Sequence, residues 1–210
     1  MVFAATLAFV SPARGAASFG GEDSTVRCPA IAVEAGAAPT AMTLNDIDHA
    51  LGAVRADHYP ELAGFDVQTR TLKSDADFLR ATVELGTAWK RARDRTYLVL
   101  VSPRLLASPP SPRALRAILT HELSHVRDYA RMSPARLAWF AATYALGPIR
   151  DYERRTDETA LEKGEGCGLV EYRLWLYARE RGGALARKKS DYYTPVEILD
   201  WIRIRAGTKP

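Results

Sequence analysis

A histidine pair one helical turn apart constrains this chain more than any other feature. Residues 121–125 read His-Glu-Leu-Ser-His, within a segment whose apolar residues recur at helical spacing. Side chains at positions i and i+4 of a helix lie one above the other, so His121 and His125 can reach a single metal ion. Glu122 lies about 100° around the same helix, where a carboxylate can take a proton from water activated by the metal. The pattern therefore predicts a zinc site with a general base beside it.

A catalytic zinc ion needs a third protein ligand and one open position. The other histidines lie far upstream, and the two cysteines lie near the chain start and in a glycine-rich stretch, so we expect a carboxylate. Glu153 and Asp157 stand one turn apart on the apolar stripe of a predicted helix, where a carboxylate is costly unless it meets a cation or a donor. We assign Glu153 to the metal. The remaining histidines and the two cysteines are not expected to bind the metal; they are His49, His58, Cys28 and Cys167.

Asp157 is the expected catalytic support residue, because an acceptor beside a ligating histidine fixes the tautomer of its ring. Glu158 points away from the apolar stripe and is predicted to be a solvated surface residue. The alternative for Glu153 and Asp157 is ion pairing with nearby arginines, namely Arg127, Arg154 and Arg155. Tyrosines could help to stabilise an oxyanion, but the sequence does not choose among Tyr129, Tyr144, Tyr152 and Tyr172.

The order of the predicted elements indicates an α+β fold, with a small sheet followed by a helical region that carries the metal site. Residues 1–27 differ from the rest and are predicted to be a leader or a disordered terminus, and residues 28–210 form one domain. A buried strand is expected at 97–101 and glycines are expected to end the helix at 151–163. The predicted helices are 43–60, 113–132, 151–163, 169–179 and 195–204, and the strands are 65–72 and 97–101, with 77–85 as strand or helix.

The apolar run Met1 to Val10, followed by small residues, resembles an export signal, although no basic residue precedes it. The protein is therefore expected to be exported to the periplasm or the cell exterior, with the cytoplasm as the alternative. Export would allow Cys28 and Cys167 to pair in an oxidising compartment. The alternative is two unrelated cysteines.

The cysteine content and the charge balance of the chain exclude several kinds of site and partner. Two cysteines without a CxxC pair exclude a thiolate zinc site and an iron–sulfur cluster. The 29 basic and 25 acidic residues give a net charge of +4, which is no nucleic-acid signature.

Residues 137–146 are too few to cross a bilayer. They predict a core or substrate-lid helix, with peripheral membrane contact as the alternative. The four tryptophans, Trp89, Trp139, Trp175 and Trp201, are expected in the core.

The stretches AILTHELSHVRDY and ERRTDETA resemble the zinc metallopeptidases with an HExxH motif and a later ExxxD motif, the gluzincins. The pattern is closer to the HtpX-like and CAAX-protease-like families than to the thermolysin-like one, and it covers about residues 97–165. The resemblance implies a zincin-like fold and one zinc ion per chain bound by His121, His125 and Glu153, with Glu122 as general base and Asp157 in support.

The function implied is a zinc-dependent endopeptidase that hydrolyses peptide bonds of a protein or peptide substrate. The sequence departs from the family at Arg154 and Arg155, which stand where smaller residues are common. No long membrane helix of the HtpX-like branch occurs, so neither substrate nor membrane topology is carried over. The alternative is a catalytically silent domain of the same fold that binds a metal or a partner.

Overall fold

A small mixed sheet forms one side of the domain. The computed structural model describes Cys28 and residues 41–74, 77–147 and 149–207. Strands β1 (Asp66–Thr71), β2 (Leu79–Val83) and β3 (Thr96–Val101) lie in the order β1-β3-β2, with β1 parallel and β2 antiparallel to β3. The strand expected at 97–101 is confirmed. It is the central strand and its residues Tyr97, Val99 and Val101 are fully buried, so the free edges of the sheet belong to β1 and β2.

Two long helices pack against this sheet, and local sequence explains where each begins. Helix α1 (Leu44–His58) starts with a capping box, in which the Thr43 side chain accepts from the Asp46 N–H and the Asp46 side chain accepts from the Thr43 N–H. Helix α3 (Pro112–Ala130) starts with a Ser111 side-chain cap and proline at the first helical position. The α3 helix carries residues 121–125, as predicted.

The remaining helices build the second half of the domain, which confirms the α+β class. Helices α2 and α7 were not predicted. Residues 187–189, which lie on α7, are all basic. None of the described helices is both long enough and apolar enough to cross a membrane. The helices are α2 (Pro103–Ala107), α4 (Pro134–Leu146), α5 (Arg150–Glu162), α6 (Gly166–Arg179), α7 (Gly182–Asp191) and α8 (Pro195–Gly207), with short 3₁₀ turns at Pro60–Leu62, Leu85–Thr87 and Ala92–Asp94.

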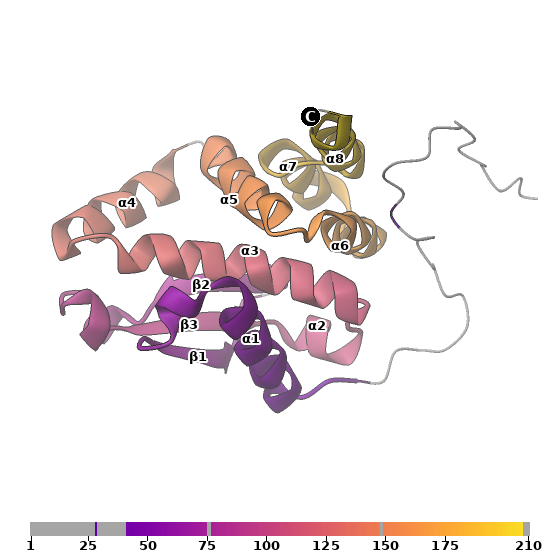
Figure 1. The fold of residues 1–210 in the computed structure, drawn as a ribbon. Coiled ribbons are helices and arrows are strands. Elements are labelled where there is room, and N and C mark those ends of the chain that lie inside the picture. Colours follow the sequence, from indigo (N-terminus) through magenta and orange to yellow (C-terminus); the bar gives the residue numbers. More distant parts are fainter. Residues whose placement is uncertain (1–27, 29–40, 75–76, 148, 208–210) are drawn as a thin grey trace, which may run out of the picture.

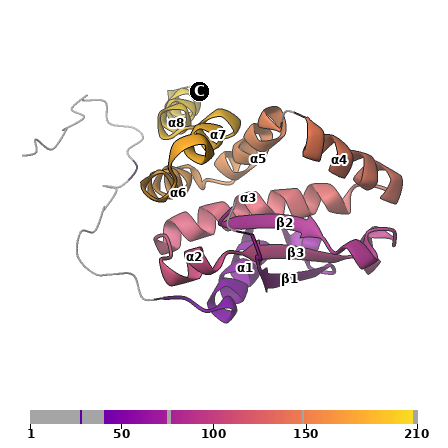
Figure 2. The same ribbon diagram turned by 180° about the vertical axis from the view of Figure 1, so that it is seen from behind.

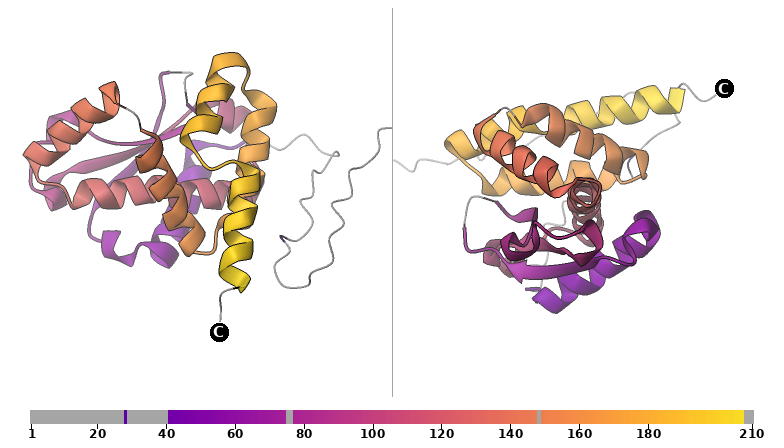
Figure 3. Two further views of the ribbon diagram at one scale, coloured as in Figure 1. Left: turned by 90° about the horizontal axis from the view of Figure 1, so that it is seen from above. Right: turned by 90° about the vertical axis from the view of Figure 1, so that its left-hand side faces the viewer.

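Helix α3 lies between two layers. The sheet and α1 lie on one side of it, and α5 to α8 lie on the other (Figure 1 and Figure 3, right). Seen from behind, the opposite face of the sheet is covered by none of the helices that the structure describes (Figure 2). Because both sides of α3 are covered, every residue from Ala117 to Val126 is buried, including five with polar side chains. Those polar groups must find partners inside the protein.

The glycines after α5 have two different roles, which corrects part of the prediction. Gly164 follows the end of α5 with a φ of 87°, a conformation that glycine adopts without strain. Gly166 and Gly168 do not end a helix but belong to the first turn of α6. A Cβ on Gly168 would lie 2.6 Å from the Arg113 carbonyl oxygen and 2.7 Å from the Ala117 Cβ. This glycine therefore allows α6 to pack closely on α3.

The prediction that the tryptophans lie in the core is wrong for two of them. Trp89 is 69% exposed and Trp139 is 72% exposed. Trp175 and Trp201 are half-buried and pack against the core. The apolar segment that contains Trp139 forms helix α4, in which Leu137 is buried.

Cys28 and Cys167 form a disulfide with a sequence separation of 139 residues. Cross-linking distant residues restricts the unfolded chain, so replacing both cysteines with serine is expected to lower the free energy of unfolding by about 2–4 kcal/mol. Urea unfolding of the oxidised protein and of the double serine variant measures this difference. Reducing agent should destabilise the wild type and leave the variant unchanged; equal stability of the two proteins would contradict the prediction.

Candidate metal centre

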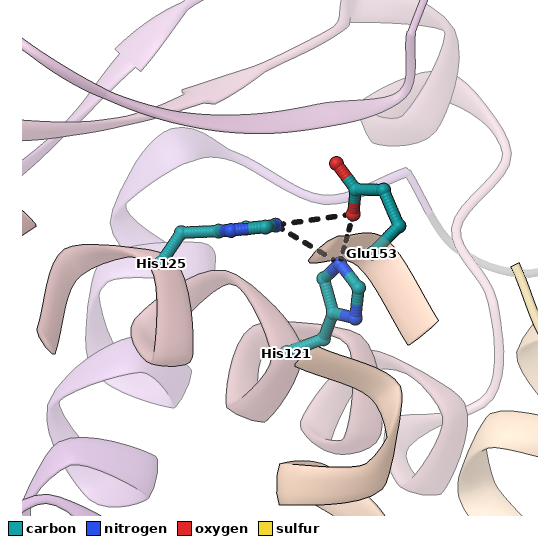
Figure 4. Close-up of side chains that lie close together, drawn as sticks. All are labelled: His121, His125 and Glu153. Atoms are coloured by element: carbon teal, nitrogen blue, oxygen red, sulfur yellow. Dashed lines mark hydrogen bonds and ion pairs between the residues drawn. The ribbon is translucent and has the colours of Figure 1, made fainter. Parts of the chain in front are cut away.

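Three side chains converge between α3 and α5. His121 and His125 come from α3, and Glu153 comes from the first turn of α5, with all three pointing toward one another (Figure 4). The two imidazole Nε2 atoms are 3.2 Å apart, and Glu153 Oε2 lies 3.2 Å from His121 Nε2 and 3.3 Å from His125 Nε2. All three residues are buried. The structure therefore brings together the three predicted ligands.

The spacing of these three atoms fits a tetrahedral metal ion. Ligands about 2.0–2.1 Å from zinc lie about 3.3 Å from each other in a regular tetrahedron, close to the distances found here. Glu153 Oε2 is buried and accepts no hydrogen bond within the described structure. A buried carboxylate oxygen without a donor is costly, and a cation at the centre of the triangle would remove that cost.

The buried charge around this group also favours a divalent cation. Three buried carboxylates, Glu122, Glu153 and Asp157, lie near one buried guanidinium, Arg173. With both imidazoles neutral, as metal ligation requires, two negative charges remain uncompensated. The donor set and the charge thus agree that these residues could hold a divalent metal ion.

Asp157 contacts His121, and the sequence predicts it to support a ligating histidine. Its Oδ1 lies 2.9 Å from His121 Nδ1, so it accepts the hydrogen bond that leaves Nε2 free for a metal. Asp157 is itself held by Arg173 Nη2, at 2.8 Å and 2.9 Å from its two oxygens, and by the Tyr193 N–H at 3.0 Å. Arg173 is on α6, so a third helix fixes the orientation of the histidine.

Two tyrosines complete the outer contacts of the other ligands. Tyr152 OH lies 3.0 Å from His125 Nδ1, and Tyr144 OH donates to Glu153 Oε1. The sequence marked both tyrosines only as candidates for oxyanion stabilisation. Tyr152 precedes Glu153 on α5, but the contact of Tyr144 depends on how α4 folds back over the site. Each of the three ligands thus has a defined partner on its outer side.

Glu122 follows His121 on α3, but it is not one of the three converging side chains. Its Oε2 accepts a hydrogen bond of 2.7 Å from the Ala81 N–H on β2. Glu122, His121 and His125 line a cavity of about 770 Å³ that β2, α4 and α7 also border. The backbone of the edge strand therefore helps to fix the position of this carboxylate in the wall of the cavity.

The protonation of the group follows from its neighbours. Burial raises the pKa of Glu122, with the two imidazoles opposing this effect. Burial would also raise the pKa of Glu153, but His121 and His125 hold it well below its usual range. For His121, burial lowers the pKa while Asp157 and Glu153 raise it more strongly, to about 9. A metal ion must displace that proton from Nε2.

Neither carboxylate pairs with the arginines that the sequence offered as alternatives, although Asp157 does pair with a different arginine. Arg154 pairs with Glu197 at 3.0 Å, and the partner of Asp157 is Arg173, which the sequence did not single out. Glu158 is half-buried rather than solvated, and it accepts a hydrogen bond of 2.7 Å from Tyr193 OH. His58, which was not expected to bind the metal, has its Nε2 atom 2.8 Å from Glu165 Oε1.

Removing either outer hydroxyl is expected to weaken metal binding. Tyr144→Phe leaves Glu153 Oε1 without its donor, and Tyr152→Phe leaves His125 Nδ1 without its partner, so each should reduce metal affinity by about 10–100-fold. Competition with a chromophoric chelator measures the affinity. Tyr177→Phe is the matched control, because the Tyr177 hydroxyl is buried without a hydrogen-bond partner in the described structure. Equal affinities in all three variants would contradict these roles.

Comparison of the chain with models of protein families, with curated proteins and with solved structures found no match. The candidate metal centre therefore stands on the geometry of its own residues.

Proposed function

We propose that this protein is a zinc-dependent endopeptidase with a zincin-like fold. The observation that carries the proposal is the convergence of His121, His125 and Glu153 at tetrahedral spacing, with Glu122 in the same cavity. Two imidazoles and one carboxylate are a ligand set typical of catalytic zinc, which keeps one position open for water or substrate. The triangle borders a cavity large enough for part of a peptide, so an open position there could be reached.

Zinc bound at this centre supplies Lewis acidity, which polarises a carbonyl group and lowers the pKa of water. Glu122 accepts a proton from the attacking water and then delivers it to the leaving nitrogen, while the new C–O bond forms and the peptide C–N bond breaks. The hydrogen bond from Ala81 fixes one oxygen of Glu122. Asp157 and Arg173 keep the His121 ring in the orientation that ligation requires.

The proposed substrate is a protein or peptide chain in an extended conformation. Strand β2 is at an edge of the sheet, and Leu79 to Val83 line the cavity. An extended chain beside such an edge can form backbone hydrogen bonds with its groups other than the Ala81 N–H, which donates to Glu122. This arrangement suits peptide hydrolysis better than hydrolysis of a compact, non-peptide amide.

The proposed location is outside the cytoplasm. A disulfide such as the one between Cys28 and Cys167 is typical of proteins in an oxidising compartment. The apolar run on which the export prediction was based, and the whole predicted leader 1–27, lie outside the described residues.

Chelation tests the proposed activity. The zinc-loaded protein is expected to cleave members of a broad peptide library, with product masses that add up to substrate plus one water. A metal chelator should abolish cleavage, and added zinc should restore it, because the ligands hold the ion reversibly. A protein that binds zinc tightly but shows no chelator-sensitive cleavage would instead be the catalytically silent metal-binding domain.

A further inference from the structure

Exposed apolar side chains flank the mouth of the cavity on two sides. Leu85 is 83% exposed and Trp89 is 69% exposed, and both line the cavity from the segment that joins β2 to β3. Across the cavity, α4 lines it with the exposed Ala138 and Ala141 and with Leu137, which is buried. The β2–β3 segment and α4 lie at the same end of the molecule in both opposed views (Figures 1 and 2).

Helix α4 is apolar on its outer side as well as on its inner side. Its sequence, PARLAWFAATYAL, has one charged residue, Arg136. Ala135, Trp139 and Ala142 form an exposed stripe at helical spacing, and none of the three lines this cavity. A helix that is apolar all round is normally buried in a core or in lipid, and this one presents a tryptophan at 72% exposure.

The charged residues within the two segments that carry these apolar side chains are all basic. Residues 85–93 include Lys90, Arg91 and Arg93 and no acidic residue, and residues 129–150 include three arginines and no acidic residue. Acidic residues Glu84, Asp94, Asp128 and Asp151 directly adjoin the two segments, and Asp77 and Asp191 line the same cavity. Within the part of the chain that the structure describes, Lys90, Arg91, Arg131 and Arg136 are exposed and take part in no ion pair. Many other arginines are paired, such as Arg113 with Glu171.

We propose that this mouth surface, defined as Leu85, Trp89, Lys90, Arg91, Arg131, Arg136 and Trp139, docks on an anionic lipid bilayer. Tryptophan is enriched where hydrocarbon meets water, because its ring is apolar and its N–H is polar. Basic residues near an anionic leaflet are attracted to it. The docking is peripheral, since apolar residues enter only the headgroup region. It does not rest on the proposed function, because contact with lipid needs neither metal nor hydrolysis.

Sedimentation with vesicles tests the docking. The full chain is expected to bind vesicles of phosphatidylcholine mixed with phosphatidylglycerol, to bind phosphatidylcholine alone much more weakly, and to lose binding as salt is raised. Trp89→Ala and Trp139→Ala should each weaken binding on the order of tenfold. Arg131→Gln and Arg136→Gln should each weaken it by about fivefold.

Matched controls lie at the other end of the molecule, on α8. Val196 is 67% exposed and the Arg203 side chain is 76% exposed, so Val196→Ala and Arg203→Gln should leave vesicle binding unchanged. Equal losses in the mouth and control variants would overturn the proposal, as would no binding to anionic vesicles at low salt. So would a Trp139→Ala variant that binds vesicles normally but has a raised KM for a free peptide, because α4 would then be a substrate lid.

Discussion

Replacing Glu122 with glutamine is expected to lower kcat for peptide hydrolysis by about 10²–10⁴-fold while zinc stays bound, since this is the usual contribution of a general base. The amide keeps the size of the side chain and an oxygen that can accept from the Ala81 N–H, but it cannot take a proton from water. Metal content by mass spectrometry, measured beside kcat, separates lost chemistry from lost metal.

Glu162→Gln is the control for this variant. Glu162 lies on α5 with its side chain 55% exposed, and it pairs with Arg205 away from the cavity, so both its kcat and its zinc content should match the wild type. A Glu122→Gln protein that retains wild-type kcat would show that another group moves the proton, and the assignment of Glu122 would be wrong.

Replacing Glu153 with alanine is expected to reduce zinc affinity by more than the roughly 10–100-fold that loss of an outer partner costs. The carboxylate is the sole anionic member of the triangle, and its removal leaves two imidazoles to hold the ion. Titration against a chelator of known affinity measures the change, and hydrolysis should fall with the bound metal. Glu162→Ala, on the same helix, should bind zinc as the wild type does.

Asp157→Asn provides the comparison that tests which acid is the ligand. It keeps the shape of the side chain beside Arg173 but removes its charge, so zinc affinity should fall less than in Glu153→Ala. Circular dichroism checks that the variant folds, because it weakens a buried ion pair. If the asparagine variant lost zinc while Glu153→Ala kept it, the roles of the two carboxylates would have to be exchanged.

The centre of the site could be predicted because its signals are local. The positions of His121, Glu122 and His125 relative to one another depend only on helical periodicity. Glu153 and Asp157 could be selected because two carboxylates on an apolar helix stripe need partners. The helix predicted at 43–60 and the buried strand predicted at 97–101 could be located for the same reason, and they are α1 and β3.

The outer partners of Asp157 and Glu153 could not be predicted, because they come from segments whose packing the sequence does not reveal. Arg173 reaches Asp157 because α6 packs on α3, and Gly168 permits that approach. Tyr144 reaches Glu153 because α4 folds back over the site. The exposure of Trp89 and Trp139 was not predicted because apolar character alone does not tell a core residue from an exposed one.

The sequence by itself determined which residues stand one helical turn apart, and therefore which imidazoles and carboxylates could share a metal ion. Only the tertiary structure decided that α3 and α5 approach closely enough for three donor atoms to lie 3.2–3.3 Å apart. The physical reason is that periodicity follows from backbone hydrogen bonds between near neighbours in the chain. The distance between two helices follows instead from side-chain packing across the whole domain.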